Sequence, residues 1–325
     1  MAGAMLSAST GLVEIVRDYV EAHQLMRRLF ARTRRGELRF AELEELVGDD
    51  EGSVLYRLKE RCHSLFRSRA ESSTLAMRRE MLFDLAVGSL FHEAMKCREN
   101  VYQREVYEPR VRALRSHADE DADALFRDFE KVLGGVAPRL EEGLRECETL
   151  LNHTREQLRV LLAEHRENGY VTRYLIENRE RVEDVFGMAL DALLDRIHGD
   201  AAAGYFCAGR SYLVSGFFED AERALAEATA RGGKRDEIER MSAYARGMAA
   251  YLGGDYPRSV EWLGRWLDTA GEADAGLANL AHAAVSRVGQ LALGDDKQRV
   301  TADAAALLER LAAVRSELPP PGETP

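Results

Sequence analysis

Apolar residues recur every three or four positions along most of the chain, the spacing of one face of an α-helix. The first stripe covers residues 12–35, where Gly36 ends it. Shorter helices are expected over residues 40–47 and 53–66, and a long amphipathic helix from the N-cap candidates at 72–74 to the residue before Pro109. The pattern predicts an all-α fold that begins with a helical domain over residues 1–118.

The most regular stretch follows Pro138 and alternates spacings of four and three residues. It consists of Leu140, Leu144, Cys147, Leu151, Thr154, Leu158, Leu161 and His165, a heptad seam typical of a coiled coil. A helix over residues 138–167 spans about 45 Å and needs an equally long partner. We expect that partner to be the amphipathic stretch 171–197, which makes residues 119–200 a long antiparallel helix hairpin. A homodimer through the 140–165 seam is the alternative.

An internal repeat follows. Its first copy reads Gly209, Tyr212, Gly216, Phe218, Ala221, Leu225 and Ala228, and a second copy reads Gly247, Gly254, Tyr256, Ser259 and Leu263. A third copy has Gly294 between apolar stretches at 277–293 and 302–314. The turn glycines Gly216, Gly254 and Gly294 stand 38 and 40 residues apart. Such a period predicts three stacked helical hairpins over residues 201–315.

This series resembles the tetratricopeptide repeat (TPR), which implies a C-terminal TPR-like α-solenoid, capped by the upstream stretch 171–197. The resemblance also implies that the first helix of each hairpin faces a concave groove. That groove would present Phe206, Arg210, Leu213, Tyr244, Met248 and Tyr251. Alternatively, some of these side chains pack against a neighbouring helix.

The implied function is that of a non-enzymatic adaptor or assembly scaffold. An aromatic and apolar groove suits a partner helix or peptide. The TPR subgroup that grips acidic chaperone tails uses a lysine and an asparagine where this chain has Phe206 and Arg210. A chaperone co-factor role is therefore not expected.

Composition and charge narrow the classes of partner and compartment. The chain has 46% hydrophobic and 31% charged residues and a formal net charge of -11, with a pI of about 5.4. An acidic chain repels a phosphate backbone, so nucleic acid is an unexpected partner. The four cysteines are widely spaced and predict buried thiols in a reducing compartment. Without a membrane-length apolar run or a basic leader, we expect a cytoplasmic protein. The proline-rich tail, 316–325, is expected to be disordered.

Residues 43–58 give the runner-up function. With Gly48 at a turn and Val54 and Leu58 at inward positions, they resemble the bacterial helix-turn-helix. This resemblance implies a bacterial transcription regulator with a C-terminal TPR-like sensor domain. Glu44 and Asp49 depart from the small and apolar residues of that motif. The second helix also has both signs of charge among its expected exposed residues, which are Tyr56, Arg57, Lys59, Glu60 and Arg61. A plain helical hairpin is therefore favoured.

Motifs for chemistry are incomplete. Glu60-x-x-His63 is a single copy of a spacing that a carboxylate-bridged metal site needs twice. His92-Glu93 lacks the second histidine of a zinc helix. The sequence has neither a phosphate-binding glycine loop nor a Gly-x-Ser-x-Gly elbow. We expect neither catalytic residues nor a metal or cofactor.

Overall fold

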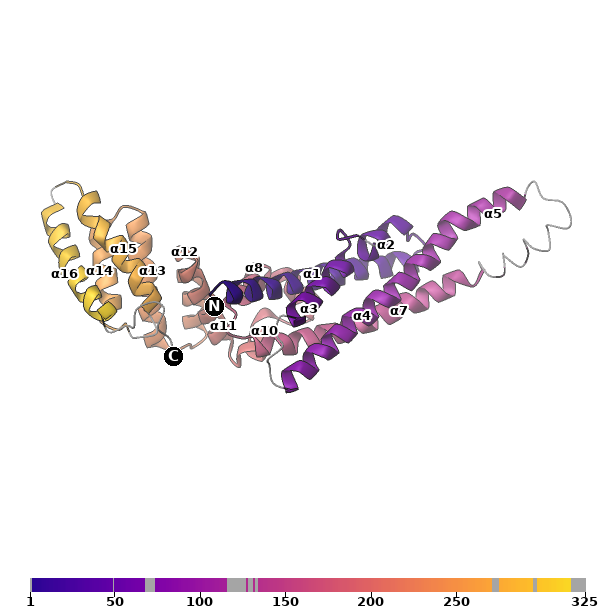
Figure 1. The fold of residues 1–325 in the computed structure, drawn as a ribbon, viewed down its shortest axis with the longest axis horizontal. Helices are drawn as coiled ribbons and strands as arrows, with labels where there is room; N and C mark the ends of the chain where they lie inside the picture. The colour runs from indigo at the N-terminus through magenta and orange to yellow at the C-terminus, as the bar shows by residue number, and fades with distance from the viewer. Residues whose placement is uncertain are drawn as a thin grey trace. The chain divides into compact units, whose positions relative to one another are not determined.

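The computed structural model describes residues 2–48, 50–67, 74–115, 127, 131, 134–270, 275–294 and 297–316. The described residues form helices, turns and short connections without a β-strand, which confirms the all-α prediction (Figure 1). Among the described helices, none has both the length and the apolar character needed to cross a bilayer. The chain divides into two compact units. Unit 1 comprises residues 1–165 and 174–190, and unit 2 comprises 166–173 and 191–325.

Four helices build the core of unit 1: α1 (Ala2–Arg34), α3 (Val54–Arg67), α4 (Thr74–Tyr102) and α7 (Val136–Glu164). α1 packs on α3, α3 on α4, α4 on α7, and α7 returns to α1. The short α2 (Phe40–Val47) packs against α4 and α3. Fully buried side chains from all four helices meet inside this ring: Ile15, Val16, Leu58, Leu90 and Leu144. Burial of such side chains is the main stabilising term of a helical core.

The helix that begins at Thr74 does not end before Pro109, so that prediction is wrong. A π-helical turn, η1 (Gln103–Tyr107), follows α4, and α5 (Glu108–Arg115) continues directly. In the π turn the backbone N–H of Glu108 donates to the carbonyl of Gln103. Pro109 has no N–H to donate, and a helix tolerates that loss best in a first turn. Because α5 begins after the π turn, Pro109 is its second residue and lies in its first turn.

The heptad seam lies on α7, and its residues from Leu140 to Leu161 are buried. Their partners are α4 and α1 rather than the stretch 171–197. The predicted long hairpin over 119–200 is therefore wrong. The seam is occupied within unit 1, which leaves its side chains inaccessible to a homodimer partner.

The stretch 171–197 is not one helix. It is divided among α8 (Gly169–Glu177), α9 (Arg179–Phe186) and α10 (Leu190–His198). Asn178 leaves the helical conformation between α8 and α9, and Gly187 ends α9 at φ 64°, a left-handed conformation that glycine adopts readily. Most residues at the start of the predicted hairpin region, from 119 to 133, and the tail from residue 317 onward lie outside the described residues.

Unit 2 consists mainly of three helix pairs: α11 (Ala201–Val214) with α12 (Phe218–Ala230), α13 (Arg235–Leu252) with α14 (Tyr256–Leu267), and α15 (Ala275–Leu291) with α16 (Lys297–Ser316). α12 packs on α13, and α14 packs on α15 and α16. Figure 1 shows these helices side by side, running alternately up and down. The predicted helices at 277–293 and 302–314 fall within a few residues of α15 and α16.

Close packing within the first two pairs depends on glycine. A Cβ atom on Gly209 would lie 2.9 Å from Cδ2 of Leu225, and one on Gly247 would lie 2.7 Å from Cγ of Leu263. Both members of this contact recur 38 residues later. The turn glycines Gly216, Gly254 and Gly294 share φ values of 80°, 79° and 86°. The repeated sequence therefore marks a repeated local structure.

Two segments that precede α11 in the chain, residues 166–173 and α10, pack on α11. A Cβ atom on Gly169 would lie 2.6 Å from Cβ of Ser211, and one on Gly204 would lie 3.1 Å from Cδ2 of Leu194. The Arg173 guanidinium stacks on the ring of Tyr212, 4.2 Å from its centroid. Residues 166–173 and α10, rather than one long helix, thus lie against α11.

Candidate functional site

The six residues predicted to face a groove do not form one accessible surface. Leu213 is 1% exposed, Tyr244 0% and Met248 8%. These three side chains belong to the core of unit 2, so they are unavailable to a partner. Phe206 and Tyr251 are half-buried, and Arg210 is exposed. Only these three remain as candidate contact residues.

An aromatic column explains the burial of Tyr244. Its ring meets Phe218 of α12 edge-on at 6.3 Å between centroids and Trp266 of α14 at 5.0 Å. Edge-to-face contacts of this kind add to the stability gained from burial alone. Burial also raises the pKa of the Tyr244 hydroxyl. The column joins the first helix pair to the second.

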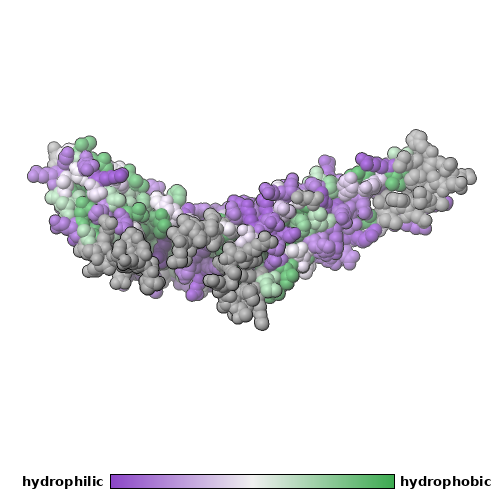
Figure 2. All heavy atoms as spheres, in the orientation of Figure 1, coloured by the Kyte–Doolittle hydropathy of each residue, from purple (hydrophilic) through white to green (hydrophobic). Residues whose placement is uncertain are grey.

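A different set of unit 2 residues is accessible and apolar. Val214 is 66% exposed, Phe217 51%, Leu252 68% and Leu293 84%. Each lies within two residues of a turn glycine, at the end where the two helices of a pair join. We call these four residues the turn-end row. Figure 2 shows green, apolar spheres at the upper edge of unit 2, by the turn from α15 to α16.

The turn-end row could have been found from the sequence. Val214 and Leu252 both stand two residues before a turn glycine, so they share a repeat position. A water-facing turn normally carries polar residues, and an apolar one at the same place twice is informative. The TPR resemblance directed attention to the helix faces instead.

The stretch that resembles a helix-turn-helix corresponds to α2 and α3, and two arginines of α3, Arg57 and Arg61, are paired with carboxylates within unit 1. Arg57 Nη2 lies 3.0 Å from Glu21 Oε2, and Arg61 Nε lies 3.1 Å from Asp18 Oδ2. Asp18 is 1% exposed. Desolvation raises the pKa of Asp18, although Arg61 and Arg57 oppose the shift. Arg57 and Arg61 are thus engaged with α1 rather than free for phosphate groups.

Glu44 of α2 and Lys59 of α3 also have contacts within unit 1. Glu44, which departs from the helix-turn-helix pattern, accepts two hydrogen bonds from Arg98 of α4, at 2.6 Å and 3.2 Å. Lys59 Nζ lies over the ring of Phe91, 4.9 Å from its centroid. Asp49 lies outside the described residues. Four charged side chains of the α2–α3 pair thus contact α1 or α4: Glu44, Arg57, Lys59 and Arg61.

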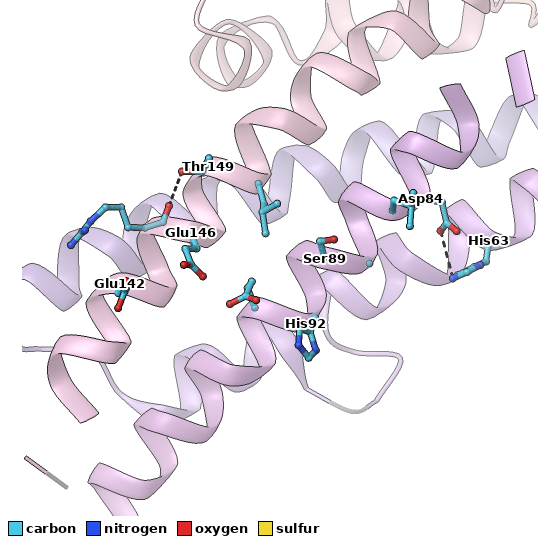
Figure 3. Close-up of a pocket in the computed structure, with 12 residues that line it drawn as sticks. His63, Asp84, Ser89, His92, Glu142, Glu146 and Thr149 are labelled. Atoms are coloured by element: carbon cyan, nitrogen blue, oxygen red, sulfur yellow. Dashed lines mark hydrogen bonds and ion pairs between the residues drawn. The ribbon is translucent and has the colours of Figure 1, made fainter. Parts of the chain in front are cut away.

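A cleft of about 870 Å³ opens on unit 1 (Figure 3). It is lined by His63 of α3, residues between 84 and 93 of α4, and residues between 142 and 150 of α7, and we call it the α4–α7 cleft. Glu142 and Glu146 on α7 lie across the cleft from Ser89 and His92 on α4. The sequence pattern did not predict it, because its residues come from three separate helices.

The histidines considered as metal ligands line this cleft. His63 Nε2 lies 3.6 Å from Asp84 Oδ1, while His92 is exposed. Within the described residues, no group of three or more His, Cys, Asp or Glu side chains is placed to hold a metal ion. Glu93 is instead bound by Lys96, whose Nζ lies 2.6 Å from Glu93 Oε1. This hydrogen bond is the main cause of the lowered pKa of Glu93.

The four cysteines lie in surroundings that do not favour reactive thiolates. Cys62, Cys97 and Cys147 are buried, as predicted, and Cys207 is half-buried. Burial raises the pKa of Cys62, and a hydrogen bond with Cys97 does so most for Cys147. Thiols with raised pKa are poor nucleophiles.

Comparison with protein-family models, with curated proteins and with solved structures found no match to this chain.

Proposed function

We propose that this protein is a non-enzymatic adaptor or assembly scaffold, and that unit 2 is a TPR-like array of helical hairpins that holds a helix or peptide of a partner protein. The observation that carries the proposal is the turn-end row. Four large apolar side chains stand exposed at one end of successive helix pairs. Exposed apolar side chains that recur from one helix pair to the next offer a partner regularly spaced contacts.

The arrangement of unit 2 supports this function. α12 packs on α13, and the pairs succeed one another along the chain. Such arrays expose long surfaces because each repeat contacts only its neighbours. Phe206, Arg210 and Tyr251 provide a further accessible set on the first helices of two pairs. A partner segment with apolar side chains at regular spacing would match the row.

The test is a triple variant, Val214→Glu with Leu252→Glu and Leu293→Glu, compared with the native chain in affinity capture from native extract followed by mass spectrometry. All three side chains are more than 60% exposed, so helicity by circular dichroism should not change. We expect loss of partner proteins that the native chain retains. Leu280→Glu is the control, because Leu280 is 47% exposed on α15 but lies away from the turns.

An unchanged set of captured partners, from a triple variant with native helicity, would contradict the assignment of the row. Loss of the same partners from the Leu280→Glu variant would also contradict it, because charge anywhere on unit 2 would then suffice.

The alternative function, a transcription regulator that binds DNA through α2 and α3, is less well supported. The two arginines of α3 that would approach phosphate groups are paired with carboxylates of α1. Binding of duplex DNA that weakens with salt, by a chain with intact helicity, would favour that alternative.

A further inference from the structure

Small side chains of α4 line the middle of the α4–α7 cleft. Gly88 and Ser89 line it between the larger side chains of Leu85 and His92. Apart from its chain neighbours and the backbone of its own helix, a Cβ atom on Gly88 would have no atom within 4 Å. The space beside Gly88 is therefore open, although the residue lies in the middle of a regular helix.

The charge of the cleft is predominantly negative. Asp84, Glu93, Glu142 and Glu146 line it, and Arg145 is the only guanidinium among the lining residues. Arg145 Nη2 lies 3.6 Å from Glu141 Oε1. The exposed carboxylates Glu142 and Glu146 stand one helical turn apart on α7, so they form an acidic wall along the cleft.

An apolar strip adjoins this acidic wall. Leu85 lines the cleft and is 62% exposed, and Met81 and Leu82, one turn earlier on α4, are 58% and 51% exposed. Green spheres gather at the lower edge of unit 1 in Figure 2, where α4 begins. Residues three and four positions apart share a helix face, so the apolar strip continues the cleft along α4.

We propose that the α4–α7 cleft binds a basic amphipathic helix of a partner protein. An amphipathic helix buries apolar side chains, spaced three and four residues apart, in a groove between two helices. Leu85, Met81 and Leu82 offer the apolar contact, and the space at Gly88 accepts a large side chain. Lysines or arginines beside the apolar face of the partner helix would meet Glu142 and Glu146.

Charge complementarity selects this occupant over others. The carboxylates repel nucleic acid and acidic peptides. A second copy of this chain, which is itself acidic with a net charge of -11, would bring its own negative charge. A partner helix that is basic as well as apolar satisfies both features of the cleft. The site lies on unit 1, so it is independent of the function proposed for unit 2.

The experiment uses the full chain and a fluorescent peptide of about 14 residues, near four helical turns, made of leucine and lysine in an amphipathic pattern. We expect saturable one-to-one binding by fluorescence anisotropy, weakened by added salt. A matched peptide with glutamate in place of lysine should bind at least about tenfold more weakly.

Two variants of the chain locate the binding. Gly88→Trp puts a large ring into the cleft from a position where a Cβ atom meets no neighbouring helix, and Glu142→Lys with Glu146→Lys reverses the acidic wall. Each should weaken binding of the lysine peptide at least about tenfold, a difference of about 1.4 kcal/mol. The control is Asp303→Lys with Glu309→Lys on α16, where both carboxylates are exposed. It makes the same change in net charge and should leave the affinity unchanged.

Three results would overturn the proposal. The first is equal binding to the native chain and to the Gly88→Trp variant, with circular dichroism showing both folded. The second is equal loss of binding in the α16 control, which would indicate attraction to net charge alone. The third is sedimentation of the native chain as a dimer that Gly88→Trp dissociates, because a second copy would then be the occupant.

Discussion

Unit 1 and unit 2 are both helical, but they bring their helices together over different distances in sequence. In unit 2, the strongest helix contacts join neighbours along the chain, such as α11 with α12 and α13 with α14. In unit 1, α1 packs on α7, and the Tyr19 hydroxyl donates to the Leu151 carbonyl, 132 residues away. Pairs of helices that are neighbours along the chain can be predicted from the local sequence pattern, whereas pairs that are distant along the chain cannot.

The interiors of the two units also differ in the kind of contact that joins their helices. Unit 1 buries Asp18 beside arginines from another helix. The joint between the first two helix pairs of unit 2 is an aromatic column, and its close helix contacts rely on glycine. Burial of a charge is costly unless it is well paired, so unit 1 depends on matched partners from distant segments. Unit 2 depends on the shapes of adjacent ones.

The largest expected effect tests the aromatic column. Trp266 is 0% exposed and contacts Tyr244, so Trp266→Ala should destabilise unit 2 by about 4 kcal/mol. Trp262, which is half-buried, is the control, and Trp262→Ala should have the smaller effect. Both tryptophans of the chain lie in unit 2. The fluorescence of the remaining tryptophan during urea unfolding therefore reports on this unit alone, and equal shifts in the two variants would refute the role of the column.

The next effect is shared by the units and concerns acid. Burial lowers the pKa of His23, in unit 1, and of His198, in unit 2, to about 4 from 6.5. The unfolded chain binds protons on both imidazoles near pH 6.5, whereas the folded chain binds them only near pH 4. The contribution of the two histidines to the free energy of unfolding is therefore complete above pH 6.5 and is lost as the pH falls from 6.5 toward 4. Each shift corresponds to about 3 kcal/mol.

Circular dichroism during urea unfolding at pH 7 and pH 4.5 should show this loss, and tryptophan fluorescence should show the part that belongs to unit 2. His198→Gln should reduce the pH dependence of the fluorescence transition, while His23→Gln should leave that transition's pH dependence in place. The reverse assignment would contradict the separation of the two histidines between units.

The smallest effect concerns glycine in unit 2. Gly247→Ala forces a Cβ atom to 2.7 Å from Leu263, and overpacking of this kind costs about 2 kcal/mol. Gly264 lies in helix α14 with only Arg310 Nη1 near, at 4.0 Å. Gly264→Ala should instead stabilise the unit by up to about 1 kcal/mol, because alanine favours helix. Thermal unfolding followed by tryptophan fluorescence separates the two, and destabilisation by both would mean that glycine is needed throughout unit 2.

The repeat region was predictable because each of its signals is local. Turn glycines, helix lengths and the Gly209 and Gly247 contacts are all set by residues within one hairpin. The burial of the predicted groove residues was not predictable, because the burial of Tyr244 depends on its contact with Trp266. Trp266 stands where the repeat has a small residue. A large ring there completes an aromatic column and draws Tyr244 into the core.

Unit 1 shows where periodicity alone is insufficient. The heptad seam correctly identified which face of α7 is buried, but apolar spacing does not specify the partner, which is α4 rather than the next helix. Gly187 was a readable signal that the stretch 171–197 is broken. The α4–α7 cleft is lined by residues of three separate helices, among them His63, Gly88 and Glu142, and no local pattern connects them.

The π turn before Pro109 also changes how the side chains around it are phased. In a regular α-helix, residues five apart point about 140° away from each other. Tyr102 and Tyr107 are five apart, yet their rings meet edge-on at 5.6 Å between centroids. Tyr102 in turn touches Phe40 at 5.1 Å, so the extra residue in the turn extends an aromatic ladder from α2 to the start of α5. Deletion of one residue between Gln103 and Tyr107 would turn the Tyr107 ring away from Tyr102, while α4 and α5 would stay helical.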